Sequence, residues 1–163
     1  MPARILYVDD EDDIREIAQM SLELEPEFEV RSCSSGMQAL ADAAEWQPDL
    51  ILLDVMMPDM DGPETLKRLA ESGPTASIPV VFITARTQTH EVERYLAMGA
   101  VGVIAKPFDP LALACESRIC LRLAGDDGLA CRSLCDAVHA PIPCRLIHLL
   151  IVLRRSRLES GCL

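Results

Sequence analysis

The sequence predicts an α/β protein: a doubly wound, five-stranded parallel sheet between two layers of helices. Two observations support this fold class. Five short apolar runs, rich in β-branched residues, alternate with longer segments whose apolar residues recur at helical spacing. Several of these runs are apolar throughout, which is typical of strands buried on both faces. Because strand and helix alternate regularly, the connections should be crossovers that cover both sides of one parallel sheet.

Each element can be assigned in chain order. The predicted strands are 5–8, 28–31, 50–53, 80–83 and 101–104. The predicted helices follow them, and their apolar faces are Ile14, Ile17, Ala18, Ser21 and Leu22; Met37, Leu40, Ala41 and Ala44; Leu66, Leu69 and Ala70; Val92, Tyr95 and Leu96; and Leu111, Cys115, Ile119 and Leu123. The last pattern ends at Gly125, a residue type common at helix ends.

Composition divides the chain into two parts. Its 163 residues suit one domain with a remainder. Residues 1–109 carry 21 acidic and 8 basic side chains, whereas residues 110–163 carry 5 and 7. The cysteines are divided in the same way. Residues 1–109 contain Cys33, and residues 110–163 contain the other six: Cys115, Cys120, Cys131, Cys135, Cys144 and Cys162. We predict a domain over residues 1–124 and a Cys- and Arg-rich tail over residues 125–163.

The net charge of −11 argues against direct binding to nucleic acid and against binding to an anionic membrane surface. Only four apolar residues separate Arg4 from Asp9, which does not resemble a signal peptide. The longest apolar run, 149–153, is too short to cross a bilayer. We therefore expect a cytoplasmic protein whose cysteines are reduced.

Polar residues stand at the carboxyl ends of four predicted strands. Asp9 and Asp10 follow the first strand, Asp54 the third and Thr84 the fourth, and Lys106 comes just after the fifth. The carboxyl ends of parallel strands form the ligand-binding edge of such a sheet. Two carboxylates about 4 Å apart repel by roughly 4 kcal/mol at an effective dielectric near 20, and a hard cation such as Mg²⁺ relieves that repulsion. A lysine and a hydroxyl can bind phosphate oxygens. The pattern therefore predicts a site that holds a phosphoryl group on, or next to, a carboxylate.

Taken singly, these residues also have simpler interpretations. An acidic pair after a strand often precedes a helix start, and Asp12 or Asp13 could cap that helix. A threonine after a strand is usually a turn residue. Asp54 is the exception because it ends a fully apolar run, where a free charge is costly unless it meets water, a cation or a partner.

Three longer stretches carry a family resemblance: 5–11, 48–62 and 79–85. Two short motifs add to it, Gly99-Ala100 and Lys106-Pro107-Phe108. From about residue 3 to about residue 113, the chain resembles the receiver domain of two-component response regulators. The resemblance implies a flavodoxin-like (βα)5 fold in three layers, α/β/α. It also implies that Asp54 accepts a phosphoryl group from a histidine kinase or a histidine phosphotransfer protein.

Further roles follow from the same resemblance. Asp10 and Asp54 would bind Mg²⁺ together with the backbone carbonyl of Met56, and Asp9 would help through water. Thr84 and Lys106 would contact the phosphoryl group, and the Lys106–Pro107 bond would be cis. A protein of this kind signals by conformational change and protein contact, and catalyses only its own phosphorylation and dephosphorylation.

Three positions bear on how such a domain signals. The family usually has an aromatic residue on the fifth strand where this chain has Val103, so we expect the aromatic switch to be absent or altered. Met56 and Arg86 flank the site at positions that tune dephosphorylation in the family. Because a hydrophobic side chain is poorly suited to orienting an attacking water, Met56 predicts a long-lived phosphoryl group.

Two other functions stay open. Asp59-Met60-Asp61-Gly62 matches the signature of haloacid-dehalogenase-like phosphatases, but Met56-Met57-Pro58 precedes it where that chemistry needs a buried strand, and Asp-Gly near Pro is first a turn signal. The second alternative is a receiver-like module that is not phosphorylated and acts only by binding another protein.

The tail shows no recognisable output domain. Cys131, Cys135, His139, Cys144 and His148 match no standard zinc spacing. Residues 146–153, followed by Arg154 and Arg155, could form an amphipathic helix for a dimer or a membrane surface. The abrupt change in composition also suggests a reading-frame change. The downstream partner is unknown, and a homodimer is one option.

Overall fold

The computed structural model describes residues 1–125 of the chain. Strands and helices alternate along these residues without exception. The elements are β1 (Ala3–Val8), α1 (Asp12–Glu23), β2 (Phe28–Cys33), α2 (Gly36–Trp46), β3 (Leu50–Asp54), α3 (Gly62–Glu71), β4 (Val80–Thr84), α4 (Thr89–Ala97), β5 (Gly102–Ala105) and α5 (Pro110–Gly125). The predicted set of five strands and five helices is therefore confirmed.

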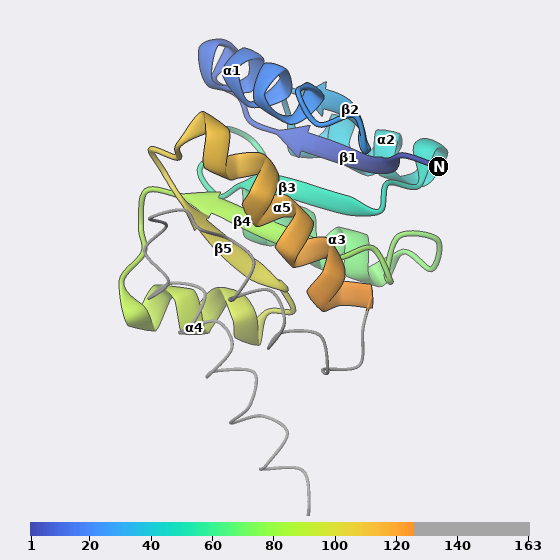
Figure 1. The fold of residues 1–163 in the computed structure, drawn as a ribbon. Coiled ribbons are helices and arrows are strands. Elements are labelled where there is room, and N and C mark those ends of the chain that lie inside the picture. Colours follow the sequence, from blue (N-terminus) through green and yellow to red (C-terminus); the bar gives the residue numbers. More distant parts are fainter. Residues whose placement is uncertain (126–163) are drawn as a thin grey trace, which may run out of the picture. The chain divides into compact units, whose positions relative to one another are not determined.

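All five strands lie in one parallel sheet in the order β2-β1-β3-β4-β5 (Figure 1). One hydrophobic cluster joins the sheet to α2, α3 and α4, and a second joins the opposite face to α1 and α5. Alternation along β1 shows the division, because Leu6 and Val8 belong to the first cluster whereas Ile5 and Tyr7 belong to the second. The predicted three-layer α/β/α architecture is therefore confirmed.

The strand boundaries differ from the predicted ones by one or two residues. Strand β2 continues to Cys33, and β5 covers Gly102–Ala105 rather than 101–104. Asp54 and Thr84 are the last residues of β3 and β4, not the first residues after them. Parallel pairing explains the extension of β3, since Asp54 lies opposite Ile83 in the register.

Of the predicted face of α2, only Leu40 packs against the core. Met37, Ala41 and Ala44 are exposed, whereas Ala39 and Ala43 are fully buried. The helix packs closely on α3 through its small residues: a Cβ built on Gly36 would lie 2.3 Å from Thr65 Oγ1. Buried and exposed alanines have the same apolar character, so a hydrophobicity pattern could not separate Ala39 and Ala43 from Ala41 and Ala44.

The predicted face of α5 was wrong at Leu111 and is only half-buried at Cys115, Ile119 and Leu123. Leu111 is 79% exposed, while Leu113, Ala114, Ser117 and Cys120 are buried. Ser117 is accommodated in the interior because its hydroxyl donates a hydrogen bond to the carbonyl of Leu113 at 2.7 Å. A polar residue on the buried face breaks the apolar pattern, and this is why the pattern pointed elsewhere.

Several predictions cannot be compared with the structure. The proposed zinc ligands, the segment 146–153 and the tail as a whole lie outside the described residues. Within residues 1–125, no helix has the length and apolar character needed to cross a membrane.

Candidate functional site

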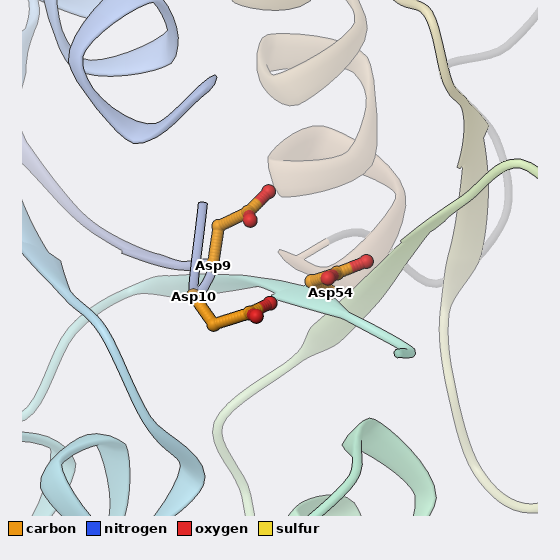
Figure 2. Close-up of side chains that lie close together, drawn as sticks. All are labelled: Asp9, Asp10 and Asp54. Carbon is orange, nitrogen blue, oxygen red and sulfur yellow. The ribbon is translucent and has the colours of Figure 1, made fainter. Parts of the chain in front are cut away.

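The carboxyl edge of the sheet brings three aspartates together. Asp9 and Asp10 follow β1 and Asp54 ends β3, and their carboxylates face one another (Figure 2). One carboxylate oxygen from each lies within 4.8 Å of the others. Asp9 and Asp54 are buried, and Asp10 is half-buried. The three residues predicted from strand ends thus form one acidic cluster.

Strand register explains this convergence. Val8 lies opposite Leu53 in the β1–β3 pairing, so each strand delivers its next residue to the same edge. In the same way, Thr84 lies opposite Ala105, and Lys106 follows directly. The backbone N–H of Lys106 donates to the carbonyl of Thr84 at 2.8 Å, and this bond holds the backbone of Lys106 against the end of β4.

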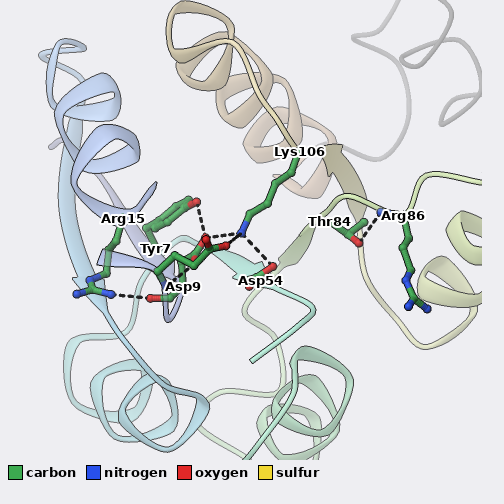
Figure 3. A network of polar contacts seen from close by, with 8 residues as sticks. Tyr7, Asp9, Arg15, Asp54, Thr84, Arg86 and Lys106 are labelled. Carbon is green, nitrogen blue, oxygen red and sulfur yellow. Dashed lines mark hydrogen bonds and ion pairs between the residues drawn. The ribbon is translucent and has the colours of Figure 1, made fainter. Parts of the chain in front are cut away.

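Lys106 supplies positive charge to the cluster. Its Nζ lies 2.6 Å from Asp9 Oδ2, 3.3 Å from Asp54 Oδ1 and 3.8 Å from Glu11 Oε1 (Figure 3). The side chain is only 14% exposed. The peptide bond from Lys106 to Pro107 is cis, as the family resemblance implied.

Asp9 is held from several directions. Its Oδ2 accepts from the Tyr7 hydroxyl at 3.2 Å as well as from Lys106, and its Oδ1 accepts from the backbone N–H of Glu11 at 3.0 Å. Its backbone carbonyl accepts from the Arg15 guanidinium at 2.8 Å. This carboxylate therefore has little rotational freedom.

Burial shifts the protonation equilibria of the site. Burial raises the pKa of the Asp54 carboxyl above its ordinary value; the charge of Lys106 opposes the rise and that of Asp9 adds to it. For Lys106, burial alone would lower the pKa, but the ion pairs with Asp9 and Asp54 outweigh it and raise the pKa. Burial, with the nearby charge of Asp9, raises the pKa of the Tyr7 phenol, so this hydroxyl stays protonated and can donate.

The cluster fits a magnesium ion by charge and by donor type. Three carboxylates and one ammonium group leave two negative charges uncompensated, and a divalent cation would balance them. Carboxylate oxygens are the ligands that Mg²⁺ prefers, with waters completing its shell. The fourth predicted ligand is the backbone carbonyl of Met56. The backbone of Met56 acts on the Asp54 carboxylate to lower its pKa, and the Met56 side chain is 63% exposed.

Thr84 and Arg86 lie beside the cluster and make local contacts. Thr84 is buried, and its hydroxyl oxygen accepts from the backbone N–H of Arg86 at 3.0 Å (Figure 3). The Arg86 side chain is 64% exposed, and its guanidinium lies 3.8 Å from Glu91. The structure thus brings Asp9, Asp10, Asp54 and Lys106 into direct proximity, whereas the hydrogen bonds of Thr84 are with its own loop and with Lys106 N–H.

Two alternative interpretations of acidic residues can now be assessed. Asp61 caps α3, since its side chain accepts from the backbone N–H of Glu64 at 2.8 Å. Asp59 is an exposed loop residue with a φ of +64°, and it is not the residue that ends β3. Both observations favour the turn over the phosphatase signature. The suggested capping by Asp12 or Asp13 is wrong, because α1 begins after Glu11 without a side-chain cap.

Sequence reasoning missed two residues of the site, Tyr7 and Glu11. Both contact other members of the cluster, through Asp9 and Lys106 respectively. For Tyr7 a signal existed, because it is the one side chain with a polar tip in the apolar run 5–8. Strand alternation places it on the same side of β1 as Asp9.

Val103 occupies a buried position on β5 and is 4% exposed. In the same cluster of the core, the ring of Phe82 on β4 packs against the ring of Tyr95 on α4, with centroids 5.1 Å apart and planes tilted by 56°. The aromatic contact between the sheet and α4 is therefore made from β4 and not from β5.

Comparison with known proteins agrees with this geometry. The family model of the response regulator receiver domain matches residues 5–116. The DNA-binding response regulator MtrA of Mycolicibacterium paratuberculosis is 38% identical over 144 residues, covering 88% of this chain and 61% of MtrA. The transcriptional regulatory protein CseB of Streptomyces coelicolor is 35% identical over 124 residues, covering 76% of this chain and 51% of CseB.

Solved structures give the same result. The chemotaxis response regulator CheY4 of Vibrio cholerae superposes with a TM-score of 0.69 at 31% identity, covering 74% of this chain and 99% of that one. The BeF3-activated DrrB receiver domain superposes with a TM-score of 0.65 at 27% identity, covering 75% and 99%. The chain spans about half to three fifths of the length of the two curated relatives described above.

Proposed function

The chain belongs to the response regulator receiver domain family, and from this premise we propose that Asp54 accepts a phosphoryl group in a Mg²⁺-dependent reaction. The observation that carries the proposal is the joint placement of Asp9, Asp10, Asp54 and Lys106 at one sheet edge. The donor would be a histidine kinase or a histidine phosphotransfer protein.

Each residue has a physical role in this reaction. A carboxylate oxygen of Asp54 forms a bond to phosphorus while the bond between phosphorus and the donor breaks. Such a transfer needs positioning and charge neutralisation more than covalent help. Lys106 would neutralise phosphoryl oxygens from a point already 3.3 Å from Asp54, and the Thr84 hydroxyl would turn from Arg86 N–H to donate to the phosphoryl group. Mg²⁺, bound by Asp10, Asp54 and the Met56 carbonyl, with Asp9 acting through water, would neutralise the remaining charge.

The acyl phosphate adds charge at the edge where β4 and β5 end. A movement of Thr84 toward it would bias the segment from β4 through α4 to β5 between two arrangements.

We propose that the output is contact with a downstream protein, with a homodimer as one form of it, and that the domain catalyses only its own phosphorylation and dephosphorylation. Direct contact with nucleic acid or membrane is not part of the proposal; the surplus of acidic residues over residues 1–109 argues against both. We also propose a cytoplasmic location.

Acetyl phosphate labelling tests the proposal. With Mg²⁺, we expect a stoichiometric mass increase of one phosphoryl group in the chain and in Asp59→Asn, none in Asp54→Asn, and none in EDTA. Undiminished labelling of Asp54→Asn would overturn the proposal. Loss of labelling in Asp59→Asn alone would favour the phosphatase. Absence of labelling in every variant would favour the module that is not phosphorylated.

The lifetime of the label is a separate expectation. The exposed, apolar Met56 offers no group that could orient an attacking water, so phosphate release should be slow. A continuous phosphate-release assay on the labelled chain measures it, and fast release would contradict the role assigned to Met56.

A further inference from the structure

Tyr7 is a buried residue to which the proposed function assigns no role. It lies on β1, has no exposed surface, and meets the ring of Phe108 edge-on with centroids 6.5 Å apart and planes at 74°. Its hydroxyl donates to Asp9 Oδ2 at 3.2 Å (Figure 3). The ring is therefore fixed in the core, and the position of the hydroxyl beside Asp9 is fixed with it.

Asp9 Oδ2 has two donors, and only one of them is mobile. Lys106 Nζ, at 2.6 Å, is carried on a long flexible side chain, whereas the Tyr7 hydroxyl is carried on a packed ring. The same ammonium group also lies 3.3 Å from Asp54 Oδ1. A phosphoryl group on Asp54 would compete with Asp9 for this ammonium group and draw it part of the way from Asp9.

That movement has a cost at Asp9. The residue has no exposed surface, and a buried carboxylate that loses its cation is strongly disfavoured unless other donors remain. The Tyr7 hydroxyl remains, and hydrogen bonds to charged groups are among the stronger ones in proteins. It thus reduces the cost of moving Lys106.

We propose that Tyr7 is a positioning residue whose hydroxyl holds Asp9 Oδ2 while Lys106 turns to the phosphoryl group. The inference rests on the proposed function, in which Lys106 contacts that group. The effect of Tyr7 should differ between the states with and without a phosphoryl group. Without a phosphoryl group, Asp9 Oδ2 keeps Lys106 whether or not Tyr7 has a hydroxyl, so Tyr7 should matter most when the phosphoryl position is filled.

Titration calorimetry on the full chain can separate the two states. One titration measures Mg²⁺ alone, and the other measures beryllofluoride, a tetrahedral analogue of the phosphoryl group, at saturating Mg²⁺. Tyr7→Phe should weaken beryllofluoride binding about tenfold, as expected for a lost hydrogen bond to a charged group, and change Mg²⁺ affinity by less than about twofold. The control is Thr75→Val, which removes a buried hydroxyl that donates to the carbonyl of Leu69 at 2.8 Å and should leave both affinities unchanged.

Each other outcome has a definite meaning. An equal loss for Mg²⁺ and beryllofluoride, or no loss for either, overturns the role of Tyr7 and leaves the proposed function standing. Failure of the unmutated chain to bind beryllofluoride, together with no acetyl phosphate labelling, contradicts the proposed function itself. If Tyr7→Phe is less stable, urea unfolding in Mg²⁺ with and without beryllofluoride gives the same comparison, because a ligand at free concentration L stabilises the folded state by RT ln(1 + L/Kd).

Discussion

Lys106 is the positive group that contacts the buried carboxylates of Asp9 and Asp54, and it is only 14% exposed. Removing one partner of a buried ion pair leaves the other uncompensated, which typically costs about 3–5 kcal/mol. Lys106→Met should therefore lower the free energy of unfolding by about 3 kcal/mol in EDTA at pH 7. Added Mg²⁺ should recover part of the loss, because the ion replaces positive charge near the same carboxylates.

Urea unfolding measures this change, and Lys67→Met is the matched control because Lys67 is exposed on α3. A loss no larger than that of the control would show that Lys106 does not balance the buried carboxylates.

The cysteines of the described domain should differ in reactivity. Burial raises the pKa of the Cys33 thiol to about 12, with Asp42 adding to the shift, and burial next to Glu116 raises that of Cys120 to about 12. Cys115 is half-buried. Because the thiolate is the nucleophile, iodoacetamide at pH 8 should modify Cys115 well before Cys33 or Cys120. Peptide mass mapping over time checks the order, which should disappear in urea; equal native rates would contradict it.

The same shifts affect stability at alkaline pH. Both thiols keep their protons to a higher pH in the folded chain than in the unfolded one. Their contribution is therefore complete below about pH 9 and is lost as pH rises from about 9 toward about 12.

At the residue scale, the sequence predicted the charges of the site better than their partners. Asp9, Asp10, Asp54 and Lys106 could be predicted because polar residues at the ends of apolar strands are conspicuous and parallel topology brings strand ends together. Tyr7 was missed because a tyrosine in a strand is normally a core residue, and only the three-dimensional distance to Asp9 shows the hydrogen bond.

At the element scale, the turn from β3 to α3 depends on Gly62. A Cβ at this position would lie 2.5 Å from the backbone oxygen of Asp54, 2.9 Å from the Cα of Val55 and 3.0 Å from the ring of Phe82. The first two of these contacts are with backbone, so the chain beside Asp54 would have to shift. Gly62→Ala should therefore destabilise the fold by about 1–3 kcal/mol and slow labelling of Asp54.

Gly73→Ala is the matched control, since a Cβ there would meet nothing within 4 Å. Urea unfolding and the rate of acetyl phosphate labelling should both separate the two variants. Equal behaviour would mean that the close approach at Gly62 has no energetic consequence.

The helices show where hydrophobic periodicity fails to predict the buried face. The type and order of all ten elements followed from alternating periodicity, and the faces of α3 and α4 were identified through Leu66, Leu69, Val92 and Tyr95. The faces of α2 and α5 were not, because their buried positions include small or polar residues, such as Gly36 packed on Thr65 and Ser117 bonded within its own helix. Hydrophobicity ranks side chains by size and polarity, whereas packing selects them by fit.

At the scale of the whole molecule, the division of the chain near residue 124 is still a prediction. Among residues 1–125, the two hydrophobic clusters cover both faces of the sheet with helices α1 to α5. Deletion of residues 126–163 should therefore leave the thermal midpoint within about 2 °C of the full chain and preserve Mg²⁺-dependent labelling. A much lower midpoint or loss of labelling would show that the tail belongs to the domain.

The site of phosphoryl attachment tests the central claim most directly. The chain is labelled with acetyl phosphate and Mg²⁺, the acyl phosphate is reduced with borohydride to the corresponding alcohol, and the modified residue is located by peptide mass spectrometry. The expected result is homoserine at position 54 and at no other aspartate, as the cluster with Asp9, Asp10 and Lys106 requires. Modification at Asp9, Asp10 or Asp59 instead of Asp54 would contradict the account.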